Sequence, residues 1–221
     1  MKQSLLILGV ALGMASPARA QDPVKVDSKH YVIVAENERV RVLKATYAPG
    51  EKSVMHEHPD TFAVFLTDSK ARFTLPDGTT TDAATKAGEV MVAPAGRHNP
   101  ENLGGALEVI VIEVKPGAKA PPPVKGAVAP PSGTGVTRTP IATGPHGEAV
   151  LLKNEAGFSE PAGSMHDYDG VVVPMTASGT ELTMGGKTVT MKKGEAYLIS
   201  RGAPHAVKAT AAGESVVVYI K

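Results

Sequence analysis

Short runs of apolar, β-branched residues recur along most of the chain, and this recurrence limits the fold more than any other feature. Asp, Gly, Pro and Asn residues separate the runs and mark turns. No window shows the 3.6-residue apolar period and the caps of a sustained helix. We therefore predict an all-β fold of barrels or sandwiches. The expected strands lie at residues 31–34, 40–43, 62–66, 72–75, 89–92, 108–114, 149–152, 171–173, 181–184, 188–191, 196–199 and 216–220.

A Pro- and Gly-rich segment interrupts this pattern at residues 116–136. Residues 116–135 contain six Pro and four Gly, with almost no large apolar side chain. Such a composition cannot supply a core and is typical of a linker. We predict an N-terminal domain at residues 21–115, a linker at residues 116–136 and a C-terminal domain at residues 137–221.

The two predicted domains look like diverged copies of one unit. Met55-His56 recurs 110 residues later as Met165-His166. Three further matches follow in the same order: Gly88-Glu89 with Gly194-Glu195, Arg97-His98 with Pro204-His205, and residues 112–115 with residues 218–221. Each match is weak alone, but their shared order indicates two similar β-barrels.

Residues 1–20 have the features of a secretory signal peptide. Lys2 gives a positive start, residues 5–15 are apolar but too short to span a bilayer, and Ala18-Arg19-Ala20 fits a cleavage site. The mature protein is therefore expected to begin at Gln21 and to be periplasmic or secreted. The absence of Cys is compatible with an oxidising compartment. It also excludes thiolate catalysis, iron–sulfur clusters and Cys-ligated zinc.

The charge pattern excludes two classes of partner. Lys and Arg total 23 and Asp and Glu total 22, without a basic run. Nucleic acid and an anionic membrane surface are therefore not expected partners. No later segment approaches the roughly 18 consecutive apolar residues of a membrane helix, so no membrane contact is expected after signal removal.

The candidate site comes from three histidines within residues 50–102. His56 and His58 are two residues apart, so in a strand both side chains point to the same face. The Gly- and Pro-containing turns that follow allow His98 to reach them from another strand. Three convergent imidazoles predict a site for a divalent metal ion, with Zn, Fe, Mn, Ni and Cu all open. The alternative is that these histidines only hydrogen-bond one another or water.

These segments resemble the two sequence motifs of the cupin superfamily. The first motif, a Gly, five residues and His-x-His, is matched by Gly50, His56 and His58. The second motif is matched by Gly88, Pro94, Gly96 and Asn102, with His98 one residue early. The resemblance covers most of the mature chain. It implies two tandem jelly-roll (cupin) barrels, a divalent metal between the histidines, and a fold that often dimerises through edge strands, so that a homodimer is an open possibility.

Several positions depart from the family motifs. Phe62 stands where the first motif has Glu, and its even spacing from the histidine pair predicts an apolar wall beside the metal. Asn102 is a candidate to orient a metal ligand through a hydrogen bond. In the second copy Tyr168 replaces the second His, so His166 and His205 are the ligands that remain. Two imidazoles alone are a poor metal site, and we predict a degenerate, structural C-terminal barrel.

Two classes of function remain open. The first is a module that binds or senses a small molecule through the metal. The second is a metal-dependent enzyme of the dioxygenase or lyase class, acting on a small anionic or phenolic substrate. The missing Glu and the lack of a credible general base near the three histidines favour binding. His30 and His146 lie in polar surroundings and are expected at the surface.

Overall fold

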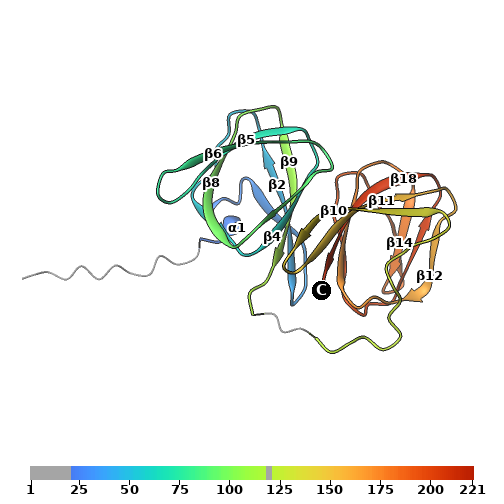
Figure 1. Cartoon of the computed structure of the whole chain (residues 1–221). Helices are drawn as coiled ribbons and strands as arrows, with labels where there is room; N and C mark the ends of the chain where they lie inside the picture. The colour runs from blue at the N-terminus through green and yellow to red at the C-terminus, as the bar shows by residue number, and fades with distance from the viewer. Residues whose placement is uncertain (1–20, 118–120) are drawn as a thin grey trace, which may run out of the picture.

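The computed structural model describes residues 21–117 and 121–221, so the predicted signal peptide lies outside the described residues. Within this part of the chain a short helix, α1 (Pro23–Val26), precedes eighteen strands (Figure 1). The fold is nearly all-β, as predicted, and none of its described helices is long and apolar enough to cross a membrane. The strands are β1 (Tyr31–Glu36), β2 (Val40–Tyr47), β3 (His56–His58), β4 (Thr61–Phe65), β5 (Ser69–Thr74), β6 (Thr80–Thr85), β7 (Val90–Ala93), β8 (Gly96–Asn102), β9 (Leu107–Val114), β10 (Val136–Gly144), β11 (Gly147–Asn154), β12 (Ser159–Ser164), β13 (Asp169–Pro174), β14 (Thr180–Met184), β15 (Lys187–Thr190), β16 (Tyr197–Ile199), β17 (His205–Ala209) and β18 (Gly213–Ile220).

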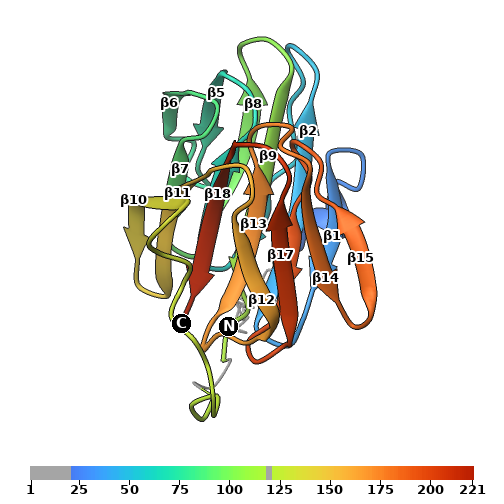
Figure 2. The same cartoon turned by 90° about the vertical axis from the view of Figure 1, so that its right-hand side faces the viewer.

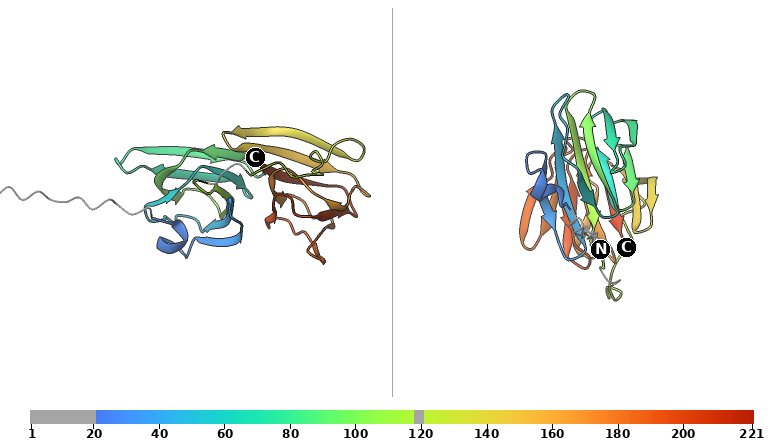
Figure 3. Two further views of the ribbon diagram at one scale, coloured as in Figure 1. Left: turned by 90° about the horizontal axis from the view of Figure 1, so that it is seen from below. Right: turned by 90° about the vertical axis from the view of Figure 1, so that its left-hand side faces the viewer.

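The strands form two sheets in each half of the chain. In the N-terminal half, residues 21–117, the sheet orders are β1-β2-β9-β4-β7 and β3-β8-β5-β6. In the C-terminal half, residues 121–221, they are β10-β11-β18-β13-β16 and β12-β17-β14-β15, the same orders with every strand number raised by nine. The two halves lie side by side in Figure 1 and in the left view of Figure 3, whereas in Figure 2 the C-terminal half lies in front of the N-terminal half. The repeat in the sequence is therefore matched by a repeat of the topology.

Two strands of the N-terminal five-stranded sheet, β4 and β9, are buried on both faces. On β9, Val109 and Val111 pack into the core between the two sheets of this half. Ile110 and Ile112 point the other way and pack against the C-terminal half. A strand that is buried on both faces carries a continuous apolar run instead of an alternating one. This double burial explains the unbroken Val-Ile-Val-Ile sequence at residues 109–112.

Phe62 belongs to the core that the two halves share and is only 1% exposed. A Cβ added to Gly144 of β10 would lie 3.0 Å from its Cζ, so the two halves meet closely here. The prediction that Phe62 lies beside the metal is therefore wrong. Even spacing keeps side chains on one face only within a continuous strand, and β3 and β4 lie in different sheets. The shared core consists of Val40, Val42, Phe62, Val64, Ile110, Ile112, Val114, Ala149, Val171, Val173, Val216, Val218 and Ile220.

Polar contacts at the edge of this core fix how the halves meet. Arg39 Nη1 donates to Asp169 Oδ2 at 2.9 Å, and Asn37 Nδ2 donates to Asp169 Oδ1 at 2.8 Å. Asp169 is 1% exposed, so its charge is compensated in a buried position. His146 Nε2 lies 2.7 Å from Asp60 Oδ2 in the other half. These hydrogen bonds and ion pairs connect the two halves around the shared core, so the halves form one packed unit.

Residues 121–135 contain no strand and lie along the C-terminal half (Figure 1). The backbone amide of Val128 donates to the carbonyl oxygen of Met165 at 2.8 Å, and that of Val124 donates to Asp167 Oδ1 at 2.9 Å. Arg201 Nη2 donates to the carbonyl oxygen of Pro122 at 3.0 Å. The described part of the predicted linker is therefore held by hydrogen bonds to one half.

Replacing Phe62 tests the shared core. Phe62→Ala is expected to lower the free energy of unfolding by about 3–5 kcal/mol, because it leaves a cavity between the halves. Metal affinity of the folded variant should stay unchanged, since the ring faces away from the histidines. Urea unfolding and metal titration check the two effects, with Phe62→Leu as the milder control. Loss of metal without loss of stability would contradict this placement.

Candidate metal centre

His56, His58 and His98 lie together between the two sheets of the N-terminal half. β3 carries His56 and His58 on one face, and β8 pairs with β3 so that His98 lies opposite His56. The ring centroids are 4.9 Å apart for His56 and His58, 4.8 Å for His56 and His98, and 5.3 Å for His58 and His98. A nitrogen of each ring lies within 4.8 Å of a nitrogen of the other two. The structure thus brings the three predicted residues together.

A buried carboxylate orients His58. His58 Nδ1 lies 2.7 Å from Glu113 Oε1, and Arg41 Nε donates to Glu113 Oε2 at 2.5 Å. A carboxylate held by Arg can only accept from the imidazole, so Nδ1 carries the proton and Nε2 keeps a free lone pair. No sequence motif points to Glu113. Its signal is a Glu that directly follows the apolar run of residues 109–112 in β9.

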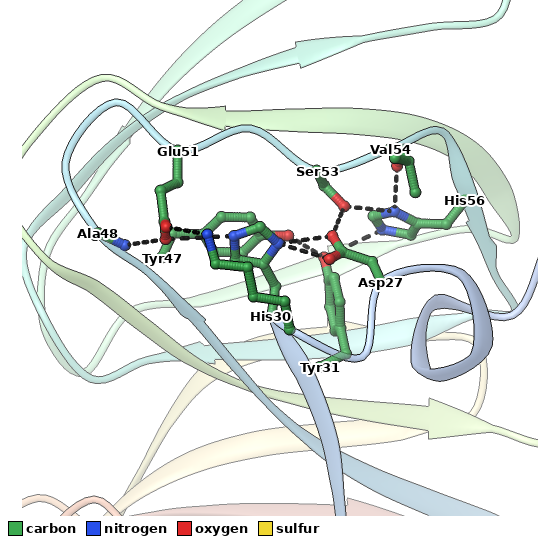
Figure 4. Close-up of polar contacts among 10 residues, drawn as sticks. Asp27, His30, Tyr31, Tyr47, Ala48, Glu51, Ser53, Val54 and His56 are labelled. Carbon is green, nitrogen blue, oxygen red and sulfur yellow. Dashed lines mark hydrogen bonds and ion pairs between the residues drawn. The ribbon is translucent and has the colours of Figure 1, made fainter.

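Backbone and phenol groups orient His56 in the same way (Figure 4). His56 Nδ1 lies 2.8 Å from the carbonyl oxygen of Val54, which can only accept, so this nitrogen carries the proton. His56 Nε2 therefore has a lone pair, which accepts from the Tyr31 hydroxyl at 3.1 Å. Tyr31 in turn accepts from the Tyr47 hydroxyl at 2.8 Å. A metal at this centre would have the Tyr31 hydroxyl as a near neighbour.

A second set of contacts reaches His56 from α1 and the loop before β3 (Figure 4). Ser53 Oγ lies 3.1 Å from His56 Nδ1 and also contacts Asp27, whose carboxylate lies 2.8 Å from His30 Nδ1. His30 stacks on Tyr47 with ring centroids 4.2 Å apart. The expectation of a surface position is wrong for His30, which is 5% exposed. Asp27 engages Nδ1 of the imidazole, and the stacking on Tyr47 covers one face of the ring inside the fold.

Burial keeps two of the three imidazoles neutral. Desolvation, together with the nearby His58, lowers the pKa of His56 from 6.5 to about 4. Desolvation likewise lowers the pKa of His98 to about 3, with His58 and His56 adding to the effect. Burial also raises the pKa of Tyr31 well above 10, so that its hydroxyl stays a donor. Neutral imidazoles with free lone pairs are the form that binds metal.

A cavity of about 100 Å³ lies next to His58 and His98. Its wall on β4 is formed by Thr61, Ala63 and Phe65, which alternate with the outward Phe62. Ala63 therefore occupies the cavity side where the sequence analysis expected Phe62. The other residues that line the cavity are Tyr31, Ala45, Tyr47, Ala71, Phe73, Met91, Ala93, Pro100, Glu101, Asn102, Leu107, Val109 and Val111.

Asn102 lines this cavity, but its side chain bonds to backbone groups. Asn102 Nδ2 donates to the carbonyl oxygens of Ala48 at 3.0 Å and Gly105 at 2.7 Å, and Oδ1 accepts from the amide of Gly104 at 3.0 Å. It is 2% exposed. These bonds tie together the loops at the far ends of β2 and β8. Asn102 therefore holds these loops together. The residue that orients His58 is Glu113.

The donor set fits a divalent ion. Three neutral nitrogen ligands suit Zn, Fe(II), Ni or Cu, whereas Mn prefers oxygen ligands. The only carboxylate that contacts one of the three rings among the described residues is Glu113, on the Nδ1 side of His58. The ion would therefore keep most of its double charge and attract a bound oxygen atom strongly.

The predicted residues of the C-terminal half also come together. His166 stacks on Tyr168 with ring centroids 4.7 Å apart, and its ring lies 4.9 Å from that of His205. Glu160, which the sequence analysis did not single out, completes a group whose potential ligand atoms lie within 4.8 Å of one another. The copy of the site is thus changed in composition, with a carboxylate added.

No protein-family model and no curated protein matches the sequence. A salicylate 1,2-dioxygenase from Pseudaminobacter salicylatoxidans is similar in structure, with a TM-score of 0.62, 11% identity, and coverage of 89% of this chain and 78% of that chain. A cupin 2 conserved barrel domain protein from Leptotrichia buccalis gives a TM-score of 0.58 at 15% identity and covers 86% and 88%. Adducts of the dioxygenase with gentisate give 0.59 at 11% identity, covering 85% and 70%. These likenesses show that the chain has a cupin fold.

The lowered pKa values predict how acid affects the metal-free protein. Unfolded His takes up a proton below pH 6.5, whereas folded His56 and His98 stay neutral down to pH values of about 4 and 3. The free energy of unfolding should therefore fall as pH drops from about 6.5 to about 4. In His98→Gln the free energy of unfolding should depend less steeply on pH, because unfolding of the variant takes up fewer protons, by up to about one. Urea unfolding in chelator, with the exposed Lys193→Gln as the control, checks it. Parallel pH profiles for wild type and His98→Gln would contradict the assignment.

Proposed function

We propose that the chain is an exported protein of two tandem cupin barrels, and that its N-terminal barrel binds a small molecule through a divalent metal. His56, His58 and His98 hold the metal. The observation that supports this most is the fixed tautomer of His56 and His58, whose Nδ1 atoms are engaged by Val54 and Glu113. Partners of this kind, which leave Nε2 unprotonated, commonly orient metal-binding histidines. At His56 a metal ion would take the place of the hydrogen bond that Nε2 accepts from Tyr31.

The residues that line the cavity favour a mainly apolar ligand with one oxygen that can bind the metal. The walls of the cavity are mainly aliphatic and aromatic, and among the described residues that line it none is Lys or Arg. A ligand would therefore bury an apolar body in the cavity and present one oxygen to the metal. A phenol, an enol or a carboxylate meets this requirement, because an anionic oxygen balances the charge of an ion held by neutral imidazoles.

The alternative is an enzyme of the dioxygenase or lyase class that acts on such a molecule. The structural likeness to a salicylate 1,2-dioxygenase favours it. A bound metal would supply Lewis acidity or, with Fe(II), redox chemistry. Tyr31 keeps its proton, and Glu113 is engaged by Arg41 and His58. Glu101, which also lines the cavity, pairs with Lys52 at 3.8 Å. The chain's own groups near the centre therefore offer little proton transfer. This shortage of a free base favours binding over catalysis.

Metal analysis tests whether the three histidines bind a metal ion. In protein made without a His-tag, His56→Ala and His98→Ala should each lower the metal content by one equivalent per chain. His146→Ala should retain it, because this imidazole is 40% exposed and pairs with Asp60. Full metal content in both site variants would overturn the proposal.

Oxygen consumption separates the two classes of function. The Fe(II)-loaded protein is expected to bind gentisate or salicylate, as followed by calorimetry, without oxygen uptake above the His98→Ala control. Oxygen uptake that depends on substrate and on His98 would favour the dioxygenase. Binding equally strong in His98→Ala would instead show that the ligand does not use the metal.

A further inference from the structure

Glu160, His166 and His205 form a buried group in the C-terminal half that the proposed function does not use. Glu160 Oε1 lies 2.9 Å from His166 Nε2, and Glu160 Oε2 lies 3.5 Å from His205 Nε2. The two imidazoles are 5% and 2% exposed, and the carboxylate side chain is 10% exposed. A carboxylate and two imidazoles therefore face one another where water has little access.

The backbone pairing explains how Glu160 reaches this group. Glu160 on β12 lies opposite Val207 on β17, and Val207 is two residues from His205. Opposite residues of paired strands share a face, so Glu160 and His205 point the same way. The register shifts between Glu160 and Ser164, where Gly163 has a φ of 81°. This bulge lets one short segment contribute Glu160 while the chain beyond it carries His166.

Both imidazoles turn Nε2 towards the carboxylate. His166 Nδ1 lies 3.0 Å from the carbonyl oxygen of Val128, and His205 Nδ1 lies 3.0 Å from that of Ala203. Carbonyl oxygens only accept, so each Nδ1 carries a proton. A neutral imidazole would then aim a lone pair at the Glu160 carboxylate. Either a proton on Nε2 or a metal ion between the two groups would remove this repulsion.

Two atoms in the group lack a hydrogen-bond partner. They are Glu160 Oε1 and His205 Nε2, which are both buried. Buried polar atoms in native proteins are nearly always satisfied by hydrogen bonds or by a bound ion. The neighbouring cavity of about 60 Å³ is lined by Tyr168, whose buried hydroxyl also lacks a partner. A metal ion would engage both unpaired ligand atoms and leave open positions towards this cavity.

We propose that Glu160, His166 and His205 bind a second divalent metal ion, independently of the three-histidine centre. Two imidazoles and one carboxylate suit Fe(II), Mn(II) or Zn(II). The carboxylate halves the net charge of the occupied site, and it makes the site more favourable for oxygen-preferring Mn(II) than three imidazoles are. The N-terminal half has Gly50 at the position 110 residues before Glu160, so this ligand set is particular to the second half.

The Pro-rich segment takes part in this site. Val128 accepts from His166 Nδ1, and the Val128 amide donates to the carbonyl of Met165, the residue before His166. Residues 121–135 thereby fix the tautomer of one ligand. The segment that the sequence predicts as a linker is also a support for the second metal.

The experiment uses Mn(II), because its EPR signal measures the concentration of the free ion. Of the candidate metals, Mn(II) also distinguishes best between a centre that has a carboxylate and one of three imidazoles. The purified protein, made without a His-tag and stripped of metal, should bind one Mn(II) tightly. Glu160→Gln and His205→Gln should each weaken this binding at least about tenfold. Glu155→Gln, an exposed carboxylate of the same half, and His98→Gln should leave it unchanged.

Equal Mn(II) affinity in wild type and Glu160→Gln overturns the proposal, and a proton would then bridge Glu160 and His205. Mn(II) binding that is lost in His98→Gln but kept in Glu160→Gln overturns it as well. Should Glu160→Gln fail to fold, the Tm of His98→Gln decides, because only the second centre remains there. A rise in Tm on adding Mn(II) supports the site, and no rise overturns it. Failure at this centre leaves the metal content of the N-terminal centre unaffected.

Discussion

The N-terminal five-stranded sheet separates two buried environments, and the rest of the structure depends on the alternation of side chains across it. On one face β4 and β9 contribute the wall of the metal cavity, and on the other they contribute the core shared with the C-terminal half. Glu113 continues the cavity side of β9 and ends next to His58. The alternation of side chains along these strands therefore determines which residues form the core and which contact the other half. It also places Glu113 where it fixes the tautomer of His58.

The two centres show how one topology can support two electrostatic environments. In the N-terminal half the carboxylate stands behind His58, so the centre itself consists of neutral nitrogen donors. In the C-terminal half Glu160 stands among the ligand atoms. A divalent ion would keep most of its charge in the first centre and about half of it in the second. An anionic oxygen ligand should therefore be attracted to the first centre more strongly.

The strands predicted from the sequence are those rich in Val, Ile and Leu, such as β9 and β18. The strands that carry the ligands were harder to recognise. β3 has three residues, β8 contains Pro100, and β12 contains Pro161 and Gly163. Such segments have little strand propensity of their own. They become strands because pairing within the four-stranded sheets satisfies their backbone groups.

The sequence by itself determined the all-β class, the internal repeat and the three histidines of the first centre, because period-two alternation and turn residues act within a few positions. Only the tertiary structure decided that Phe62 faces the other half, that His30 is buried, and that Glu113 and Glu160 meet imidazoles. Glu113 lies 55 residues from His58, and Glu160 lies 45 residues from His205. Contacts over such separations depend on which strands pair and which faces meet, and no local spacing encodes that.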